Sequence, residues 1–308
     1  TRYRSVWAGT TVSHCTVVVD GRETTRGHAE RTNSRLREYV ADAPGFQLVS
    51  AENPNAYPQH AETYRRTLAM IGRDSRDAYL LDVFHVIGGR RHDYLLHGSA
   101  DEDSTATLQG AALTPFHGTL MNPGVAFVEP KGESTGHPEL GFGMIRDLRR
   151  APPAESLVLD IRLTAAPDTG TRTLLTAPGA PLTAYLGRSP SIRRAQESDA
   201  RLDDYLMPTF AAQRLSDAGA LETVFVAAHE PIHGDSTLAE IASRRQGDGL
   251  LVTVRRTDGR TDYFAMSLNA APTPAAFDTP DGTLTVDGAW GLIRVKAGVA
   301  VEAHLIGG

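Results

Sequence analysis

Short apolar and β-branched runs, separated by turn residues, are the main pattern along this chain. The first run, Val12–Val19, ends at Asp20-Gly21, a pair typical of a tight turn between strands. Tyr64–Ile71 and Ala78–Ile87 are separated by a charged segment and predict a hairpin. Further strands are expected at Leu36–Val40, Phe46–Val49, His92–Gly98, Leu157–Leu163, Arg172–Ala177, Gly249–Arg255, Thr261–Leu268, Thr283–Val286, Trp290–Val295 and Val299–Leu305.

The remaining segments are less regular. Leu108–Gly143 is rich in Gly, Pro and small residues and is expected to be dominated by loops. Residues 178–204 are mostly polar and predict no strand. Leu221–Ala228 indicates a buried strand, and His229–Pro231 after it is interpreted as a loop because of its proline. Leu238–Arg244 is short enough to be a strand or one helical turn.

The composition agrees with an all-β protein. The 308 residues include 29 Gly and 18 Pro spread along the chain, and no long helical period is present. A hydrophobic content of 41% is enough to build a sizeable core. We expect a large antiparallel β-sandwich (a supersandwich) over residues 1–235 and a small C-terminal β-sheet over residues 236–308.

The charge balance limits the classes of binding partner that we expect. A formal net charge of −6 argues against nucleic acid and against an anionic membrane surface, and no stretch of eighteen apolar residues predicts a membrane span. Arginine pairs such as Arg65-Arg66 and Arg90-Arg91 are either solvated strand faces or clamps for carboxylates. The only cysteine, Cys15, excludes a disulfide within the chain.

Three residues are candidates for chemistry. His14 lies in the first predicted strand; a strand histidine is either a hydrogen-bonded core residue or, with a carboxylate and a second histidine nearby, a zinc ligand. Tyr3, flanked by Arg2 and Arg4, is either amphipathic packing or a proton-transfer group whose anion the arginines stabilise. His97 alternates with apolar residues and is either a satisfied strand histidine or a sugar contact at a sheet edge.

The run Ser13–Gly21 resembles the S-x-H-N-T-x-x-V-D-G stretch of the heparinase II/III-like polysaccharide lyases. The segments Tyr64–Leu68, Leu81–Gly89, His92–Gly98 and Phe225–Pro231 are also similar to strands of that family, and together with Thr261–Tyr263 they spread the resemblance over most of the chain. This chain has Cys15 where the family pattern has Asn, so the side-chain amide contact of that position is lost or altered.

The resemblance implies a carbon–oxygen lyase that cleaves a uronic-acid polysaccharide, such as a glycosaminoglycan or alginate, by β-elimination. It implies that His14 binds a structural zinc ion whose other ligands, a His and an Asp, precede Thr1. It also implies a helical toroid domain before this chain, without which the chain is expected to be inactive, and a bacterial, periplasmic or secreted location. If the chain is interpreted as part of such a lyase, Tyr3 is the candidate catalytic residue and His97 is the candidate substrate-binding residue.

Two other classes of function remain open from the residues. A non-catalytic carbohydrate-binding or structural β-sandwich needs only a sugar-facing platform, for which Trp7 and Trp290 are the tryptophans available. A glycoside hydrolase needs two carboxylates facing each other across a cleft, and Asp82 and Glu230 are the pair to test.

Overall fold

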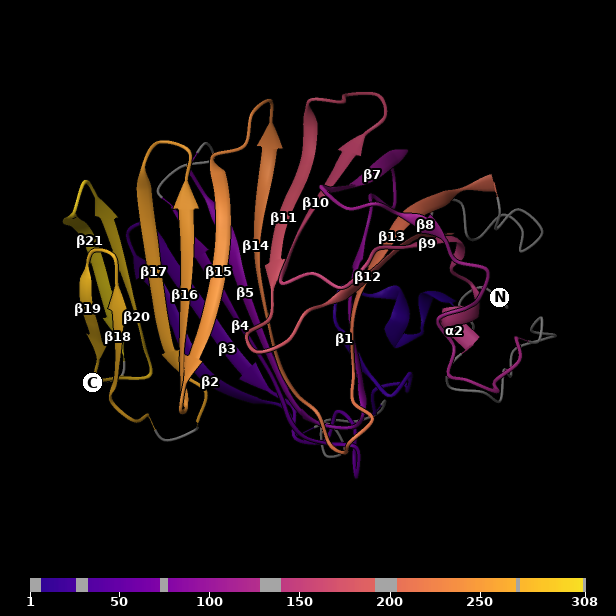
Figure 1. Cartoon of the computed structure of the whole chain (residues 1–308), viewed down its shortest axis with the longest axis horizontal. Helices are drawn as coiled ribbons and strands as arrows, with labels where there is room; N and C mark the ends of the chain where they lie inside the picture. The colour runs from indigo at the N-terminus through magenta and orange to yellow at the C-terminus, as the bar shows by residue number, and fades with distance from the viewer. Residues whose placement is uncertain are drawn as a thin grey trace.

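The computed structural model describes residues 7–25, 33–72, 77–127, 140–191, 204–269 and 272–306. Within these ranges the chain is almost entirely β-structure, arranged as stacked antiparallel sheets (Figure 1). No helix in the described part of the chain is long and apolar enough to cross a membrane. The all-β prediction with large antiparallel sheets is therefore confirmed.

A six-stranded sheet carries the N-terminal strand of the described chain. Its order is β1-β6-β13-β12-β9-β8, and every neighbouring pair is antiparallel. Its strands are β1 (Val17–Val19), β6 (Arg91–His97), β8 (Thr114–Pro115), β9 (Arg146–Arg150), β12 (Thr183–Pro190) and β13 (Leu206–Leu215).

An eight-stranded sheet forms the middle of the stack, in the order β2-β3-β4-β5-β14-β11-β10-β7. Its strands are β2 (Arg35–Ala43), β3 (Phe46–Glu52), β4 (Ala61–Ile71), β5 (Tyr79–Gly88), β7 (Ser104–Gln109), β10 (Ser156–Leu163), β11 (Thr169–Thr176) and β14 (Glu222–His233).

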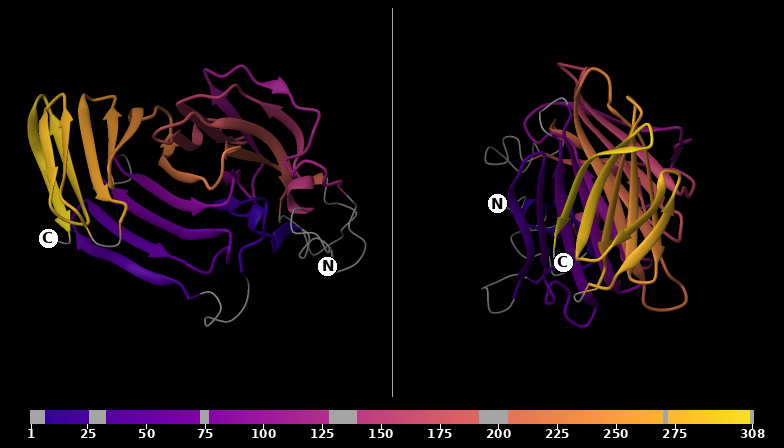
Figure 2. Two further views of the ribbon diagram at one scale, coloured as in Figure 1. Left: turned by 60° about the horizontal axis from the view of Figure 1, so that its bottom comes forward. Right: turned by 90° about the vertical axis from the view of Figure 1, so that its left-hand side faces the viewer.

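The C-terminal strands form a five-stranded sheet in the order β15-β16-β17-β20-β21, with a separate β18–β19 hairpin beside it (Figure 1). Figure 2 shows these strands gathered at the end of the molecule that carries the C-terminus. The strands are β15 (Leu238–Gln246), β16 (Gly249–Arg256), β17 (Arg260–Ser267), β18 (Ala275–Thr279), β19 (Gly282–Val286), β20 (Trp290–Lys296) and β21 (Val299–Ile306).

Alternation along β5 explains the stacking. Phe84 and Val86 belong to the hydrophobic cluster shared with the six-stranded sheet, whereas Leu81 and Val83 belong to the cluster shared with the five-stranded sheet. Successive strand residues point to opposite faces, so the apolar residues of β5 are buried on both. The boundary predicted at residue 236 falls between β14 and β15, but these sheets share a core, and the division into domains stays a prediction.

The outer face of the six-stranded sheet is also covered. Trp7, Val12 and Phe142 pack there against Leu95 and Tyr185, which point away from the sandwich interior. The cover consists of the segment before β1, the loop after β8 and the short helix α2 (Leu140–Gly143). A pocket of about 810 Å³ lies on this covered face.

Two strand predictions need correction at their ends. Only Val17–Val19 of the first run is a strand; Thr11–Ser13 is a 3-10 turn, because the Thr10 and Ser13 hydroxyls bond to nearby carbonyl oxygens and compete with sheet pairing. The strand predicted to stop at Ala228 continues to His233. Pro231 is tolerated because β14 pairs there with β11 alone, its pairing with β5 having ended at His229.

Residues 178–204, predicted to lack a strand, contain β12, and β13 follows shortly after. Within β12, alternate positions face the sandwich core and the outer cover, so both faces are buried although several side chains are polar. A hydrophobicity pattern underestimates such strands because tertiary packing supplies the apolar surroundings.

Candidate functional site

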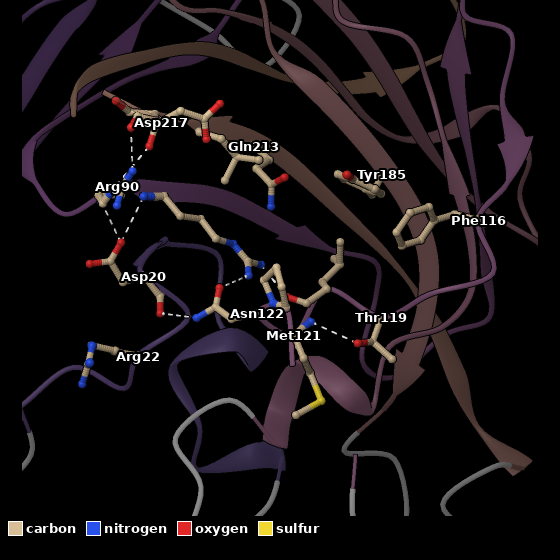
Figure 3. A pocket seen from close by; sticks show the side chains of 15 residues that line it. Asp20, Arg22, Arg90, Phe116, Thr119, Met121, Asn122, Tyr185, Gln213 and Asp217 are labelled. Carbon is tan, nitrogen blue, oxygen red and sulfur yellow. Dashed lines mark hydrogen bonds between the residues drawn. The ribbon is translucent and has the colours of Figure 1, made fainter. Parts of the chain in front are cut away.

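A pocket of about 810 Å³ lies at one end of the outer face of the six-stranded sheet. Its lining comes from the turn after β1, the turn between β5 and β6, the loop after β8, and strands β12 and β13. Figure 3 shows Tyr185 and Phe116 on one side of this pocket and Asp20 and Arg22 on the other. We call it the arginine pocket because Arg22, Arg90 and Arg91 contribute to its wall.

Asp20 holds the walls of the arginine pocket together. Its backbone adopts a positive φ of 52°, which ends β1 in a tight turn with Gly21. One carboxylate oxygen accepts the backbone N–H groups of Arg90 (2.7 Å) and Arg91 (3.0 Å), and the Asp20 carbonyl accepts the Asn122 side-chain amide (3.0 Å; Figure 3). Three chain segments are therefore fixed relative to one another.

Arg91 is buried and its charge is compensated. Its Nε lies 2.7 Å from Asp93, and its other nitrogens donate to Asn122 and to the Leu120 carbonyl oxygen. Burial raises the pKa of Asp93, although Arg91 and a hydrogen bond from Gln213 favour its charged form. This part of the pocket is a fixed polar wall rather than a free cation.

Arg90 and Arg22 keep positive charge at the pocket surface. Among the described residues, the Arg90 guanidinium donates to the carbonyl oxygens of Ser216 (3.3 Å) and Asp217 (2.7 Å) and to no carboxylate. Arg22 is exposed, and its guanidinium has no hydrogen-bond or ion-pair partner among the described residues. Guanidinium groups in this state are suited to binding the carboxylate of a ligand.

Tyr185 contributes a phenol hydroxyl to the arginine pocket. Its ring packs edge-on against Phe116 at a centroid distance of 5.3 Å, and the Arg150 guanidinium lies 5.9 Å from its centroid. Its hydroxyl forms no hydrogen bond with any residue in the described ranges. Burial raises the pKa of Tyr185, with Arg150 and Arg91 acting in the opposite direction. The phenol is therefore protonated at neutral pH, and nearby cations are placed to stabilise its anion.

His14 lies away from the arginine pocket, in the exposed loop before β1. Three side chains hold this loop: His97 bonds the Val12 carbonyl oxygen (3.0 Å), Arg66 donates to the Cys15 carbonyl oxygen (3.0 Å), and the Tyr64 hydroxyl contacts the Thr16 hydroxyl (2.9 Å). Cys15 itself is exposed. The position of His14 is thus set by the sandwich beneath it.

A buried polar chain supports the His14 loop. Asp82 is fully buried and accepts two hydrogen bonds from Arg66 and one from the Tyr94 hydroxyl (2.8 Å), which also contacts His229 Nε2 (3.1 Å). The opposite nitrogen of His229 contacts the Thr173 hydroxyl at 2.9 Å. Burial disfavours the Asp82 carboxylate, but His229 and Arg66 together lower its pKa to about 2.

The sequence candidates do not converge in one place. Tyr3 lies outside the described residues. The ring nitrogens of His97 contact the Val12 carbonyl oxygen and the Thr209 hydroxyl, and burial lowers the pKa of His97 to about 4. His97 and Arg91 stand at opposite ends of β6, about 20 Å apart at roughly 3.3 Å per residue. Substrate binding by His97 stays a prediction.

The described residues do not fit a zinc site. No group of three or more His, Cys, Asp or Glu side chains is placed to hold a metal within the described ranges, and His14 is exposed with only Cys15 beside it as a further donor type. Zinc binding by His14 therefore stays a prediction that requires ligands from outside these ranges.

The carboxylate pair suggested for a glycoside hydrolase lies on opposite faces of one sheet. Asp82 pairs in register with Ala227, three positions before Glu230 on β14, so the two side chains point in opposite directions. Glu230 is buried and accepts hydrogen bonds from Ser236 and Thr237. This pair cannot face a common cleft.

The arginine pocket contains one group that the sequence pattern indicated and one that it missed. Arg90-Arg91 was recognisable as a candidate carboxylate clamp from its adjacent arginines. Tyr185 fell in the segment predicted to lack a strand. The run Thr183–Leu186, with a β-branched and an aromatic residue on one face and two apolar residues on the other, was the available signal.

Comparison with known proteins gives a likeness in structure only. No protein-family model matches the chain, and no curated protein matches it. Two structures of a heparinase III gene product, one with methylated lysines, align with TM-scores of 0.47 and 0.46 at 13% and 12% identity. A crystal structure of heparinase III aligns with a TM-score of 0.47 at 11% identity. The alignments cover 84–85% of this chain but only 30–31% of those chains.

Proposed function

We propose that this chain is the β-sheet region of a polysaccharide lyase and that the arginine pocket binds a carboxylated sugar of an acidic polysaccharide. Two observations support the proposal: the resemblance of the Ser13–Gly21 run to the heparinase II/III-like lyases, and the chemistry of the pocket. The observation that carries it is the Tyr185 hydroxyl, protonated and without a hydrogen-bond partner in the described structure, in a pocket lined by guanidinium groups.

The proposed reaction is β-elimination. A base removes the proton from the carbon next to the sugar carboxylate, the C–H electron pair forms a carbon–carbon double bond, and the C–O bond to the neighbouring sugar breaks. The departing oxygen takes a proton. Arg90 and Arg22 are placed to neutralise the carboxylate, which makes the C–H proton more acidic, and Tyr185 supplies the proton to the leaving oxygen.

The residues that line the arginine pocket in the described structure include no histidine or lysine, and the Asp20 carboxylate already accepts the backbone N–H groups of Arg90 and Arg91. The proposal therefore includes a helical partner domain that contributes the base and the opposite wall of the cleft. Structural zinc at His14 belongs to the same proposal, with its other ligands outside the described residues.

The experiment compares binding with turnover. Isothermal titration of this chain with alginate, heparan-type and hyaluronan-type oligosaccharides measures binding. The increase in ultraviolet absorbance from unsaturated uronate measures cleavage, with this chain and with the protein that includes any residues encoded before Thr1. Binding that is lost in Arg90→Ala, with cleavage by the longer protein, supports the proposal. Failure of both forms to bind any of these polymers contradicts it.

A second candidate, a carbohydrate-binding module without catalysis, is favoured by one observation. Tyr185 is the only phenol among the described pocket residues. The two carboxylates of the pocket, Asp20 and Asp217, lie on the side away from Tyr185 (Figure 3). A binding module predicts oligosaccharide binding in every form of the protein and unsaturated products in none.

A further inference from the structure

Gln213 is a buried polar residue in the middle of the arginine pocket. On β13 it lies two residues from Ala211, which pairs with Tyr185 of β12, and two residues from Leu215, which pairs with Arg91 of β6. Each of these strand positions is roughly 7 Å away, at about 3.4 Å per residue. Figure 3 shows the Gln213 side chain between Tyr185 and the cationic end of the pocket. A sugar that spans the pocket therefore passes Gln213.

A hydrogen bond to Asp93 fixes the orientation of the Gln213 amide. Gln213 is only 7% exposed, and its Nε2 donates to Asp93 Oδ1 at 2.8 Å. Asp93 is fully buried, and Arg91 Nε lies 2.7 Å from its other oxygen. Because Arg91 compensates its charge, Asp93 is a carboxylate, which accepts hydrogen bonds and donates none. The amide therefore turns its NH₂ group toward Asp93 and presents its carbonyl oxygen, Oε1, to the pocket.

The Gln213 carbonyl oxygen is an unused acceptor. Within the described ranges it accepts no hydrogen bond, although the rest of the side chain is buried and held by Asp93. A buried acceptor that stays unpaired costs free energy, and a bound ligand that supplies an O–H or N–H removes this cost. A carboxylate or an ester oxygen cannot do so, because neither has a proton to donate. This part of the pocket therefore favours a hydrogen-bond donor.

We propose that Gln213 accepts a hydrogen bond from a free ring hydroxyl of the bound uronate and so excludes sugars in which this hydroxyl is capped. The inference rests on the proposed function and adds a specificity-determining residue to it. With the sugar carboxylate at Arg90 and the leaving oxygen at Tyr185, the ring and its hydroxyls lie beside Gln213. An O-acetyl ester at such a hydroxyl removes the donor and leaves the buried carbonyl oxygen unpaired.

The test uses one mannuronate oligomer with free ring hydroxyls and the same oligomer after O-acetylation, with affinities from isothermal titration. We expect the parent protein to bind the free form at least about tenfold more tightly, the effect of one buried acceptor left unpaired. Gln213→Met keeps the length of the side chain and removes its carbonyl oxygen, so the preference should fall to about twofold or less. Gln47→Met, at an exposed glutamine of β3, is the matched control and should keep the full preference.

The outcomes separate this inference from the proposed function. If the parent protein binds both forms equally, Gln213 reads no hydroxyl, while the arginine pocket still binds uronate. If the preference persists in Gln213→Met, the acetyl group is excluded by its bulk and the role of Gln213 is wrong. If the parent protein binds neither form, the proposed function fails. Where Gln213→Met does not fold, Gln213→Asn, whose shorter side chain withdraws the carbonyl oxygen, takes its place with the same expected result.

Discussion

Arg66 and Asp82 form a two-pronged ion pair between adjacent strands β4 and β5, with Nε–Oδ1 and Nη2–Oδ2 distances of 3.0 and 2.8 Å. The remaining nitrogen of Arg66 reaches the Cys15 carbonyl oxygen. Asp82 is fully buried, whereas the Arg66 side chain is 30% exposed. One guanidinium therefore both compensates a buried charge and fixes the loop that carries His14.

We expect Arg66→Met to destabilise the protein by about 3 kcal/mol, because removing one partner of a buried pair leaves the other charge uncompensated. Urea unfolding followed by circular dichroism measures the loss. Arg149→Met, an exposed arginine on β9, is the matched control and should change the free energy of unfolding by less than about 0.5 kcal/mol. Equal losses in the two variants would show that the ion pair is not what stabilises this region.

Buried histidines predict a loss of stability in mild acid. Burial lowers the pKa values of His85 and His92 to about 4, below the ordinary value of about 6.5. As pH falls from about 6.5 to about 4, the unfolded chain takes up these protons before the folded chain does. Each histidine then reduces the free energy of unfolding by up to about 1.4 kcal/mol per pH unit. Above pH 6.5 neither contributes to the slope.

The variant that tests this is His92→Gln, whose amide can replace the contacts of His92 with Thr223 and the Gly88 carbonyl oxygen. Unfolding free energies measured from pH 7 to pH 4 should fall less steeply for the variant than for the parent protein. Parallel curves would mean that His92 titrates alike in the folded and unfolded chains.

A cluster of charges joins the five-stranded sheet to the eight-stranded sheet. Asp262 on β17 is buried and accepts hydrogen bonds from Arg294 (2.6 and 3.2 Å) and from the Tyr79 hydroxyl of β5 (3.0 Å), while Arg256 lies 3.5 Å away. We expect Asp262→Ala to cost about 3–5 kcal/mol, because two buried guanidinium groups lose their shared carboxylate. The loss is measured by urea unfolding.

Asp248→Ala, in the exposed turn between β15 and β16, is the control for Asp262→Ala. Hydrogen exchange should show faster exchange at the contact between the two sheets in Asp262→Ala and not in the control. Unchanged exchange there, with normal stability, would mean that the hydrophobic cluster alone joins the sheets.

Tyr185→Phe removes one oxygen from the arginine pocket and keeps the ring that packs on Phe116. If Tyr185 donates the proton to the leaving oxygen, kcat of the cleaving form falls by about 10²–10⁴-fold, while oligosaccharide affinity changes little. Tyr263→Phe, which removes a hydroxyl bonded to Asp281 in the C-terminal sheet, is the control and should retain kcat. Retained cleavage in Tyr185→Phe would remove the tyrosine from the mechanism.

The parts of the fold that were predictable are those whose apolar pattern reports local burial. Strands β4, β5 and β16 are dense in β-branched and aromatic residues, and the sequence indicates them directly. Strand β13 is buried along most of its length only because two other layers cover it, which no local pattern reveals. The end of β14 was mispredicted because the tolerance of Pro231 depends on which neighbouring strand is present.

The candidate site also contains residues that the sequence could predict and residues that it could not. Arg90 and Arg91 adjoin in sequence, so their joint role was open to prediction. Tyr185 meets them only because β12 and β6 belong to one sheet with β13 between them. His14 and His97 were chosen separately from local patterns, and in the structure the His97 ring contacts the Val12 carbonyl oxygen, two residues before His14.

The contacts around this loop bear on the prediction that His14 binds zinc. His14 projects from a loop whose backbone is held by His97 and Arg66, so its position does not depend on a metal. We expect the protein that includes any residues before Thr1 to bind zinc, and His14→Ala to lose most of it, because the variant removes one of the zinc ligands. His233→Ala, an exposed histidine at the end of β14, is the control and should retain the metal. Equal zinc content in both variants, measured by mass spectrometry of the metal, would show that His14 is not a ligand.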